Sequence, residues 1–188
     1  MKKLVIGLFV LGVIVSVSSA SQAKFGLKVN AQSTAYVTSI SSGSSTLSSS
    51  TSTDPIIGAG IAYSHPLKDN WSLIIEGQYN TASGYTNSLG SKVTMQVHPI
   101  EVSLQNNFEG WYLGGGLNYS LWSMSTSTSV ADEQNSIGMQ FYGGWKELFL
   151  AKTDLEIKYT YMGASVVSSG IRITQGFGSL SIGPKYWL

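Results

Sequence analysis

The residues of this chain that could perform acid–base or nucleophilic chemistry are few and scattered. His65 and His98 are the only histidines, each directly precedes a proline, and the chain has no cysteine. Hydrolysis or acyl transfer needs a nucleophile, a base and an orienting acid within hydrogen-bonding reach of one another. Two separated histidines beside prolines suit a turn and a strand irregularity better than a general base or a metal site. The sequence therefore predicts no enzyme and no metal or other cofactor.

The glycines Gly114, Gly115 and Gly116 are a second candidate for ligand chemistry, because glycine-rich loops can hold phosphate groups. A phosphate-binding loop leads into a helix. These glycines lie instead within an alternating, strand-like segment, so we expect no phosphate site.

Six charged residues have a more informative pattern, and their chemistry is ion pairing. Three are acidic and three are basic, and each lies on the polar side of a segment in which apolar and polar residues alternate. In a confined space such residues can pair with one another, whereas around an open pore they would select ions. The six residues are Lys28, Glu76, Glu101, Glu156, Lys158 and Lys185.

The composition excludes several classes of protein that could carry these residues. The chain has 188 residues, enough for one ordinary domain, with 43% hydrophobic and only 11% charged residues. Ordinary soluble domains contain about 25% charged residues. The 11 Lys and Arg residues nearly balance the 10 Asp and Glu residues. A disordered chain, a coiled coil, a nucleic-acid-binding protein and a disulfide scaffold are all excluded.

The first 23 residues predict a secretory signal peptide. Lys2 and Lys3 precede the apolar or small run from Leu4 to Val17, and small residues follow as far as Ala23. This run is shorter than the roughly 20 apolar residues that a membrane-spanning helix needs. We expect cleavage after Ala23, or less favourably after Ala20, and a single domain over residues 24–188.

Beyond the signal, apolar residues recur with a period of two, which is typical of strands with one apolar and one polar face. In the fourth segment the apolar phase changes at His98 and Pro99, which predicts a β-bulge because proline cannot donate to the ladder. No helical pattern competes, so the expected fold class is all-β. Eight segments show the alternation, and they begin near Phe25, Ile57, Trp71, Val93, Trp111, Ile137, Leu155 and Leu180.

The connections between these segments alternate between short and long. This layout is typical of an up-and-down antiparallel barrel in an outer membrane, with short turns in the periplasm and long loops outside. A soluble lipocalin-type barrel is the alternative, but its outer face would carry many charges, and this chain has too few. The short connections span 65–70, 106–110 and 146–152, and the long polar ones span 38–55, 81–91, 123–135 and 163–176.

Aromatic residues predict where the barrel crosses the two water–lipid boundaries, which Trp and Tyr prefer. The alternative is that aromatic residues are simply common in strands. We expect one aromatic girdle at the short turns, formed by Tyr63, Trp71, Trp111, Trp145, Tyr186 and Trp187, and another near the long connections, formed by Tyr36, Tyr79, Tyr119, Trp122 and Tyr161.

The signal peptide, the eight segments, the connection lengths and the C-terminal alternation resemble the small OmpA/OmpX-type outer-membrane β-barrel proteins. That alternation is Leu180, Ile182, Pro184, Tyr186 and Leu188. The resemblance implies an eight-stranded antiparallel up-and-down transmembrane β-barrel located in the outer membrane. Such proteins usually end in an aromatic residue that the insertion machinery reads, whereas this chain ends in leucine and has a proline in its last strand.

With apolar side chains facing lipid, the six charged residues face the lumen. We expect them to form one layer in its periplasmic half and to act as a structural plug, because eight strands enclose little more than their own side chains. A gated ion path is the alternative. The outer half of the lumen is expected to be neutral and polar, with Asn30, Gln32, Gln78, Asn80, Asn118 and Gln140.

The long connections are the remaining candidates for function. Thr38 to Thr53 contains 13 Ser or Thr among 16 residues. Such a tract forms either flexible loops or a rim of strands beyond the membrane. We expect a monomeric outer-membrane barrel with a structural or surface-interaction role, whose partners are membrane lipid and surface ligands rather than nucleic acid. The alternatives are a small nonspecific channel and, less favoured, a soluble ligand carrier.

Overall fold

The computed structural model describes residues 23–42, 45–52, 54–86, 92–126, 134–168 and 171–188. The predicted signal peptide lies outside these residues except for Ala23. No helix among the described residues is long and apolar enough to cross a membrane. The strands are β1 (Lys24–Ser42), β2 (Ser45–Ser52), β3 (Ile56–Pro66), β4 (Trp71–Asn80), β5 (Ser83–Thr86), β6 (Lys92–Asn107), β7 (Trp111–Thr126), β8 (Gln134–Leu150), β9 (Thr153–Ser168) and β10 (Ile171–Trp187).

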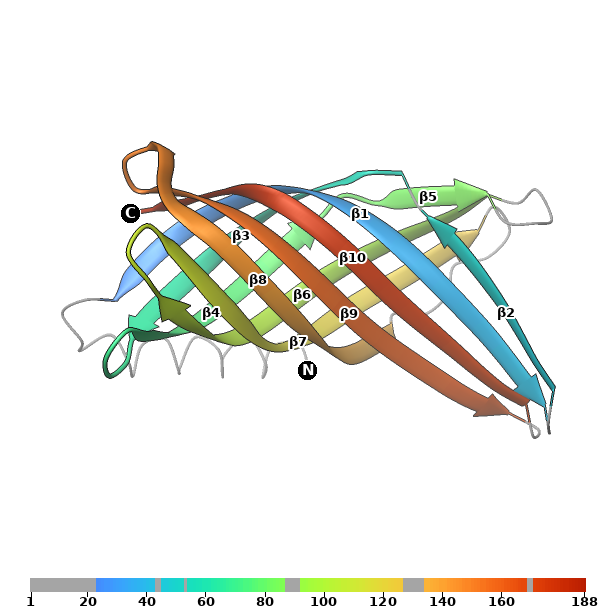
Figure 1. Ribbon diagram of the computed structural model, residues 1–188. Coiled ribbons are helices and arrows are strands. Elements are labelled where there is room, and N and C mark those ends of the chain that lie inside the picture. Colours follow the sequence, from blue (N-terminus) through green and yellow to red (C-terminus); the bar gives the residue numbers. More distant parts are fainter. Residues whose placement is uncertain (1–22, 43–44, 53, 87–91, 127–133, 169–170) are drawn as a thin grey trace, which may run out of the picture.

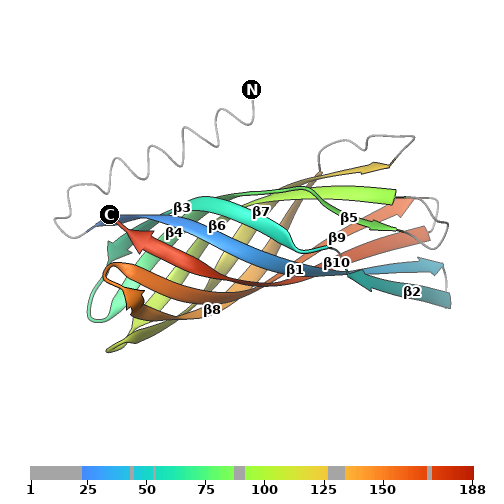
Figure 2. The ribbon, with the colours of Figure 1, turned by 90° about the horizontal axis from the view of Figure 1, so that it is seen from above.

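These ten segments make eight barrel strands. β2 and β3 both pair with β1 and run one after the other along it, so they are two parts of one strand, and β4 and β5 are related in the same way along β6. Every pairing between neighbours is antiparallel, and β10 returns to pair with β1 from Gly26↔Trp187 to Ser42↔Ile171. The chain is therefore a closed, eight-stranded, all-antiparallel β-barrel, as the sequence predicted (Figures 1 and 2).

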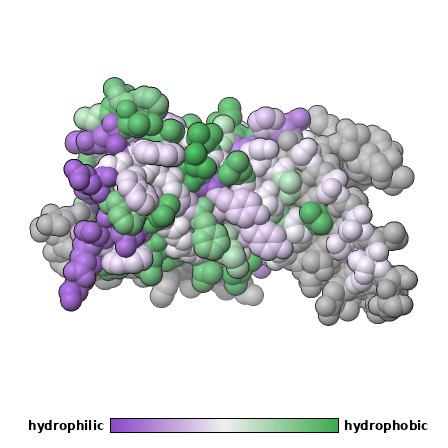
Figure 3. Space-filling model, in the orientation of Figure 1, coloured by the Kyte–Doolittle hydropathy of each residue, from purple (hydrophilic) through white to green (hydrophobic). Residues whose placement is uncertain are grey.

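The period-two pattern sorts side chains between the two faces of this wall. In β1, for example, Leu27 and Val29 are exposed on the outside, whereas Lys28 and Asn30 are buried in the lumen. The outer face carries a belt of exposed apolar side chains, and Figure 3 shows such residues over the middle of the wall, beside a hydrophilic end. The belt includes Phe25, Leu27, Val29, Ile57, Ile61, Val102, Leu104, Leu113, Leu117, Ile137, Met139, Phe141, Leu180 and Ile182.

The two ends of the barrel differ. The turn end carries the short connections 67–70, 108–110 and 151–152. At the opposite end, the rim end, strands continue far into the segments that the sequence suggested were long loops, because β1, β2, β5, β7, β9 and β10 all extend there. Ser and Thr tolerate extended backbone, and each extension pairs with a neighbour, so the rim of strands weighed in the sequence is the structure observed.

The β-bulge predicted at His98 and Pro99 in β6 is wrong. β6 pairs with β7 in one unbroken register from Val93↔Thr126 to Asn107↔Tyr112, and Val97, Pro99 and Glu101 all lie on the buried side. The irregularity is in the neighbouring strand. The β4–β6 ladder ends at Gly77↔Ile100, and β5 resumes the pairing with β6 at Ser83↔Met95. The segment from β4 to β5 therefore contains one residue more than the part of β6 that it faces. Pro99 has no backbone N–H to donate to this neighbouring strand, so the extra residue lies between β4 and β5 rather than in β6.

Two glycine–tyrosine pairs show how tightly the lumen is filled. Tyr112 pairs with Gly144, and Gly114 pairs with Tyr142, across β7 and β8. A Cβ atom on Gly144 would overlap the ring of Tyr112, and one on Gly114 would overlap the ring of Tyr142. The absence of side chains at these glycines therefore lets two large rings lie flat against the inner wall.

We predict that Gly144→Val destabilises the barrel, whereas Gly77→Val does not. A valine at 144 must displace the Tyr112 ring, and overpacking of this kind costs about 1–3 kcal/mol. Gly77 is the matched control because a Cβ there meets nothing within 4 Å. Urea unfolding in detergent micelles measures both changes, and equal midpoints for the two variants would contradict the close packing of Tyr112.

Candidate functional site

The lumen holds a layer of six charged side chains, hereafter the ionic layer. They come from β1, β4, β6, β9 and β10, and their exposed fractions range from 0% for Lys185 to 5% for Glu76. These are the six residues that the alternation assigned to the inner face: Lys28, Glu76, Glu101, Glu156, Lys158 and Lys185.

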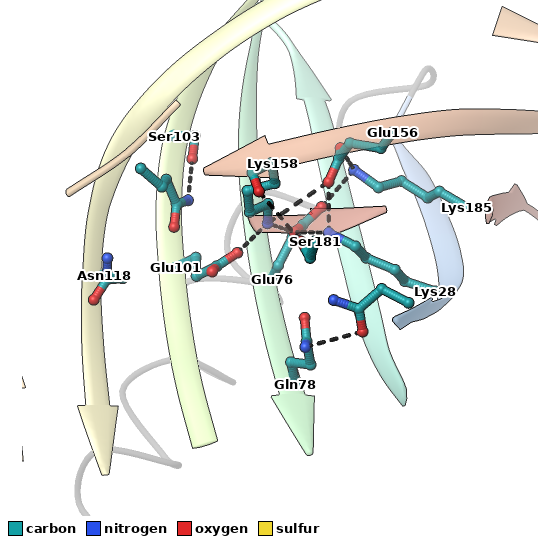
Figure 4. Close-up of polar contacts among 12 residues, drawn as sticks. Lys28, Glu76, Gln78, Glu101, Ser103, Asn118, Glu156, Lys158, Ser181 and Lys185 are labelled. Atoms are coloured by element: carbon teal, nitrogen blue, oxygen red, sulfur yellow. Dashed lines mark hydrogen bonds and ion pairs between the residues drawn. The ribbon is translucent and has the colours of Figure 1, made fainter. Parts of the chain in front are cut away.

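Two carboxylates at the centre of the ionic layer each contact all three lysines (Figure 4). Glu76 lies 2.5 Å from the Nζ atoms of Lys158 and Lys185 and 3.2 Å from that of Lys28. Glu156 lies 2.5 Å from Lys28 Nζ, 2.6 Å from Lys185 Nζ and 3.7 Å from Lys158 Nζ. Glu101 pairs with Lys158. Each charge therefore meets at least one opposite charge.

Several ion pairs connect strands that are not neighbours in the wall, whereas Lys185 and Glu156 lie on the adjacent strands β10 and β9. In the order β9, β8, β7, β6, β4, the strands of Lys158 and Glu76 are four positions apart in an eight-stranded ring, which places them on opposite walls. The two partners are also far apart in the chain, 82 positions from each other. The ionic layer therefore spans the lumen from wall to wall.

The three positive and three negative charges of the layer balance, and this balance offsets the free-energy cost of burying them away from water. Removing one charge from water carries a large desolvation cost, which only good geometry and complete pairing offset. Such networks add little net stability compared with apolar packing, but losing one partner leaves the others uncompensated.

Aromatic rings line the ionic layer on its side toward the turn end. The hydroxyl of Tyr112 donates to Glu156 Oε2 at 3.3 Å. Lys185 Nζ lies 6.0 Å from the ring centroid of Tyr112, 5.7 Å from that of Tyr142 and 5.5 Å from that of Trp187. An ammonium group over aromatic faces is attracted by the ring quadrupole, so these rings help to hold Lys185.

The neutral polar residues expected in the outer half of the lumen lie on the inner wall. Gln78 Nε2 donates to Asn30 Oδ1 at 3.1 Å and to Asn80 Oδ1 at 2.5 Å. Gln140 Nε2 donates to Ser103 Oγ at 2.6 Å. Asn118 is buried as well, whereas Gln32 is half-buried.

An apolar cluster also fills the lumen, and sequence reasoning missed it. It consists of Val97, Trp122, Met162 and Phe177, with Trp122 and Phe177 ring centroids 5.5 Å apart. The period of two could have revealed it, since Met162 lies an even number of residues from Glu156 and Lys158 on β9 and so shares their inner face. The sequence placed Trp122 in the outer girdle, but Trp122 is 8% exposed and points inward in phase with Tyr112 and Asn118.

Little space remains between these groups. A cavity of about 10 Å³ lies between the ionic layer and the apolar cluster, with Asn80, Glu101, Lys158 and Met162 among its lining residues. A single water molecule needs about this much space.

The other predicted girdle residues divide into two groups. Trp71, Trp111, Trp145 and Tyr186 are exposed on the outside near the turn end, and Tyr79 and Tyr161 are exposed toward the rim end. Tyr63 is buried beside Phe25, Tyr119 is half-buried, and the side chain of Tyr36 lies outside the described residues. Trp187 differs, because its Nε1 donates to the buried Asp154 at 2.7 Å.

The histidines lie in separate places on β3 and β6. The ring of His98 stacks on Tyr79 at a centroid distance of 4.5 Å, and its Nδ1 accepts from the backbone N–H of Asn80 at 3.4 Å. His65 stacks near Tyr63 at 6.4 Å. Within the described part of the chain, no group of three or more His, Cys, Asp or Glu side chains is arranged to hold a metal ion.

No protein-family model and no curated protein matches this chain. Its structure is similar to that of Neisserial surface protein A, with 13% identity, a TM-score of 0.49, and coverage of 84% of this chain and 96% of that one. It is also similar to Ail, the attachment invasion locus protein of Yersinia pestis, with 13% identity, a TM-score of 0.38, and coverage of 85% of this chain and 99% of that one. A third similar structure is that of the outer membrane protease OmpT from Escherichia coli, with 9% identity, a TM-score of 0.44, and coverage of 88% of this chain and 97% of that one. The barrel architecture stated above rests on this chain's own strand pairing.

We predict that Glu156→Ala lowers the free energy of unfolding by about 3–5 kcal/mol, because it leaves three buried lysines facing two carboxylates. Glu109→Ala, in the exposed 108–110 turn, is the control and should change it by less than about 0.5 kcal/mol. Urea unfolding of both proteins in detergent micelles measures the difference.

A double variant tests whether the loss comes from charge imbalance. Glu156→Gln with Lys28→Met restores neutrality and should recover part of the stability that Glu156→Gln alone loses. Equal stability of the Glu156→Ala protein and the unaltered chain would instead mean that water reaches the ionic layer.

Proposed function

We propose that this chain is an integral β-barrel of a bacterial outer membrane, that its lumen is closed, and that it acts at the cell surface through its rim. The observation that carries the proposal is the combination of an apolar outer wall with a charge-neutral ionic layer and an apolar cluster that together close the lumen. The proposed role is structural or one of surface interaction and involves neither catalysis nor a cofactor.

The outer wall supports membrane insertion. Its belt consists of exposed aliphatic and aromatic side chains, such as Ile61, Leu117 and Ile137. Contiguous apolar surface of this kind is unfavourable in water and favourable in hydrocarbon. A barrel is one of the two structures that can span a bilayer, because closure leaves no strand edge unpaired within it. A soluble carrier would have the reverse arrangement, with its apolar face inward.

The filled lumen supports a closed barrel rather than a channel. The ionic layer crosses from wall to wall, the apolar cluster lies beyond it, and the cavity between them is about 10 Å³. A solute path would require both groups of side chains to move together. The nonspecific channel is therefore the less favoured of the two functions.

The unequal ends support an orientation in the membrane. Outer-membrane barrels place short turns in the periplasm and longer segments outside. In this chain the turn end would then face the periplasm and the rim end the exterior.

The rim offers a means of interaction because it divides into two β-sheet flaps. Among the described residues, β2 pairs only with β1, and β9 beyond Met162 pairs only with β10, which makes one flap of β9, β10, β1 and β2. β5 and the outer part of β7 pair only with β6, which makes the second flap. Figure 1 shows the two flaps diverging, and the hydrogen bond from Asp54 N to Gly84 O, 3.4 Å long, joins them near their base.

Divergent flaps leave strand edges outside the membrane. An edge strand presents unpaired N–H and C=O groups, to which an extended segment of another protein can add. The proposed surface ligand is therefore an extended polypeptide that adds to a flap edge through its backbone.

We predict that the folded chain conducts no ions. The mature domain, refolded into detergent and added to a planar lipid bilayer, should leave the membrane current at its baseline. Folded, inserted protein is confirmed by protease resistance of the barrel in the same lipid. Reproducible discrete current steps would overturn the closed lumen and make the ionic layer the selectivity filter of a channel.

We predict that deletion of residues 41–52 reduces attachment through the rim, because it removes β2 and its edge. Bacteria displaying the full chain should attach to cultured epithelial cells several-fold more than bacteria carrying an empty vector, and the deletion should remove at least half of that gain. Equal amounts of both proteins in the outer membrane are the control. Attachment that is unaltered by the deletion excludes this flap edge as the binding surface.

A further inference from the structure

The hairpin that joins β8 to β9 at the turn end displays an apolar tip, defined as Leu148, Phe149 and Leu150. Their exposed fractions are 46%, 77% and 69%. Phe149 is the most exposed of the large hydrophobic residues in the described part of the chain. Figure 3 shows a hydrophobic group at the place where Figure 1 draws this hairpin, next to the hydrophilic turn end.

The base of this hairpin is firmly held on both sides. The backbone N–H of Lys146 donates to Gly110 O at 2.9 Å, and its Nζ donates to Phe108 O at 2.7 Å. On the other side, Trp187 N donates to Lys152 O at 2.8 Å. The apolar tip therefore extends from a well-anchored base.

Strained backbone flanks the apolar tip. Glu147 has φ of 49° and Lys152 has φ of 63°, both in the left-handed region that residues other than glycine seldom adopt. Between Trp145 and Leu150 the β8–β9 register shifts, and Figure 1 shows the hairpin bending away from the line of the strands. Strain of this kind persists where the surrounding structure enforces it, and it often marks functional segments.

Hydrogen bonds to the side chains of Asp154 and Glu147 enforce this bend. Asp154, which is 6% exposed, accepts from the backbone N–H of Glu147 at 3.3 Å and from Trp187 Nε1 at 2.7 Å. The side chain of Glu147 in turn accepts from the backbone N–H of Lys152 at 3.1 Å. The fold thus uses polar contacts to turn three apolar side chains outward.

We propose that the apolar tip inserts into the periplasmic leaflet of the membrane that surrounds the barrel, as an interfacial anchor. This inference rests on the outer-membrane placement proposed above. The partner is phospholipid, whose acyl chains receive Leu148, Phe149 and Leu150 and whose phosphate groups lie near the flanking lysines.

The surroundings of the tip favour lipid over a protein partner. The tip follows Trp145, which is exposed on the outer wall, so it continues the apolar surface that faces the membrane. Lys146 and Lys152 flank the tip, so their ammonium groups lie beside the segment that would meet the phosphate groups of the lipid. Three side chains are also far fewer than the 20–30 residues, roughly, that a stable protein interface uses on each side.

An anchor on one side of the turn end restrains the barrel. The other short turns, 67–70 and 108–110, do not carry three consecutive apolar residues. Insertion of one tip therefore sets the depth of that side of the barrel and limits rotation and tilt, which are otherwise governed by the belt alone.

The absence of cysteine allows a direct test. Phe149→Cys, Leu117→Cys and Lys68→Cys are each labelled with a nitroxide in proteoliposomes that contain anionic phospholipid. Electron paramagnetic resonance then compares collision with dissolved oxygen, which concentrates in lipid, and with a water-soluble nickel chelate. Leu117 represents the belt, and Lys68 is the matched control in another exposed turn.

We expect oxygen-dominated collision at positions 149 and 117 and nickel-dominated collision at 68. Nickel-dominated collision at 149 with oxygen-dominated collision at 117 overturns the anchor and leaves the membrane placement intact. Nickel-dominated collision at 117 overturns the membrane placement and the anchor with it. Oxygen-dominated collision at 68 as well as 149 overturns the specific role of the tip, because the whole turn end would then be immersed.

Discussion

The pairing of β10 with β1 is the interaction on which the rest of this structure depends. It joins the first and last strands from Gly26↔Trp187 to Ser42↔Ile171 and converts a sheet into a tube. Closure removes the strand edges from the wall and gives every strand one inner and one outer face. A side chain's place in the period of two then decides between two very different environments, so charges must face inward and the apolar belt outward.

A narrow lumen limits what the inward side chains can be. The six charges of the ionic layer are accommodated there because three acids meet three bases, with Lys158 and Glu76 on opposite walls. The rings of Tyr112 and Tyr142 are accommodated because glycines face them on the adjacent strand. The apolar cluster around Trp122 and Phe177 fills the section beyond. Charge neutrality and volume together account for the small space that is left between the ionic layer and the apolar cluster.

The two ends are where the constraint of closure is relaxed. At the rim end the ladder divides into flaps with exposed edges, and at the turn end the β8–β9 hairpin leaves the strand direction. Backbone groups there need not be paired within the wall, since water or a partner can satisfy them. Both proposed interactions, with an extended polypeptide and with phospholipid, therefore use segments that the closed wall does not constrain.

Alternation alone determined the eight strands, the all-β class and the inner or outer face of most residues, including the six charges, because period two is a local property of the chain. Which lysine meets which glutamate was decided by tertiary structure. Lys158 and Glu76 meet only through the stagger of strands on opposite walls. The same holds for Val97, which the unbroken β6–β7 register places inside, and for the extension of the Ser and Thr tracts into a rim. Register and strand pairing are long-range properties, since a shift of one residue exchanges the two faces, and no local pattern specifies them.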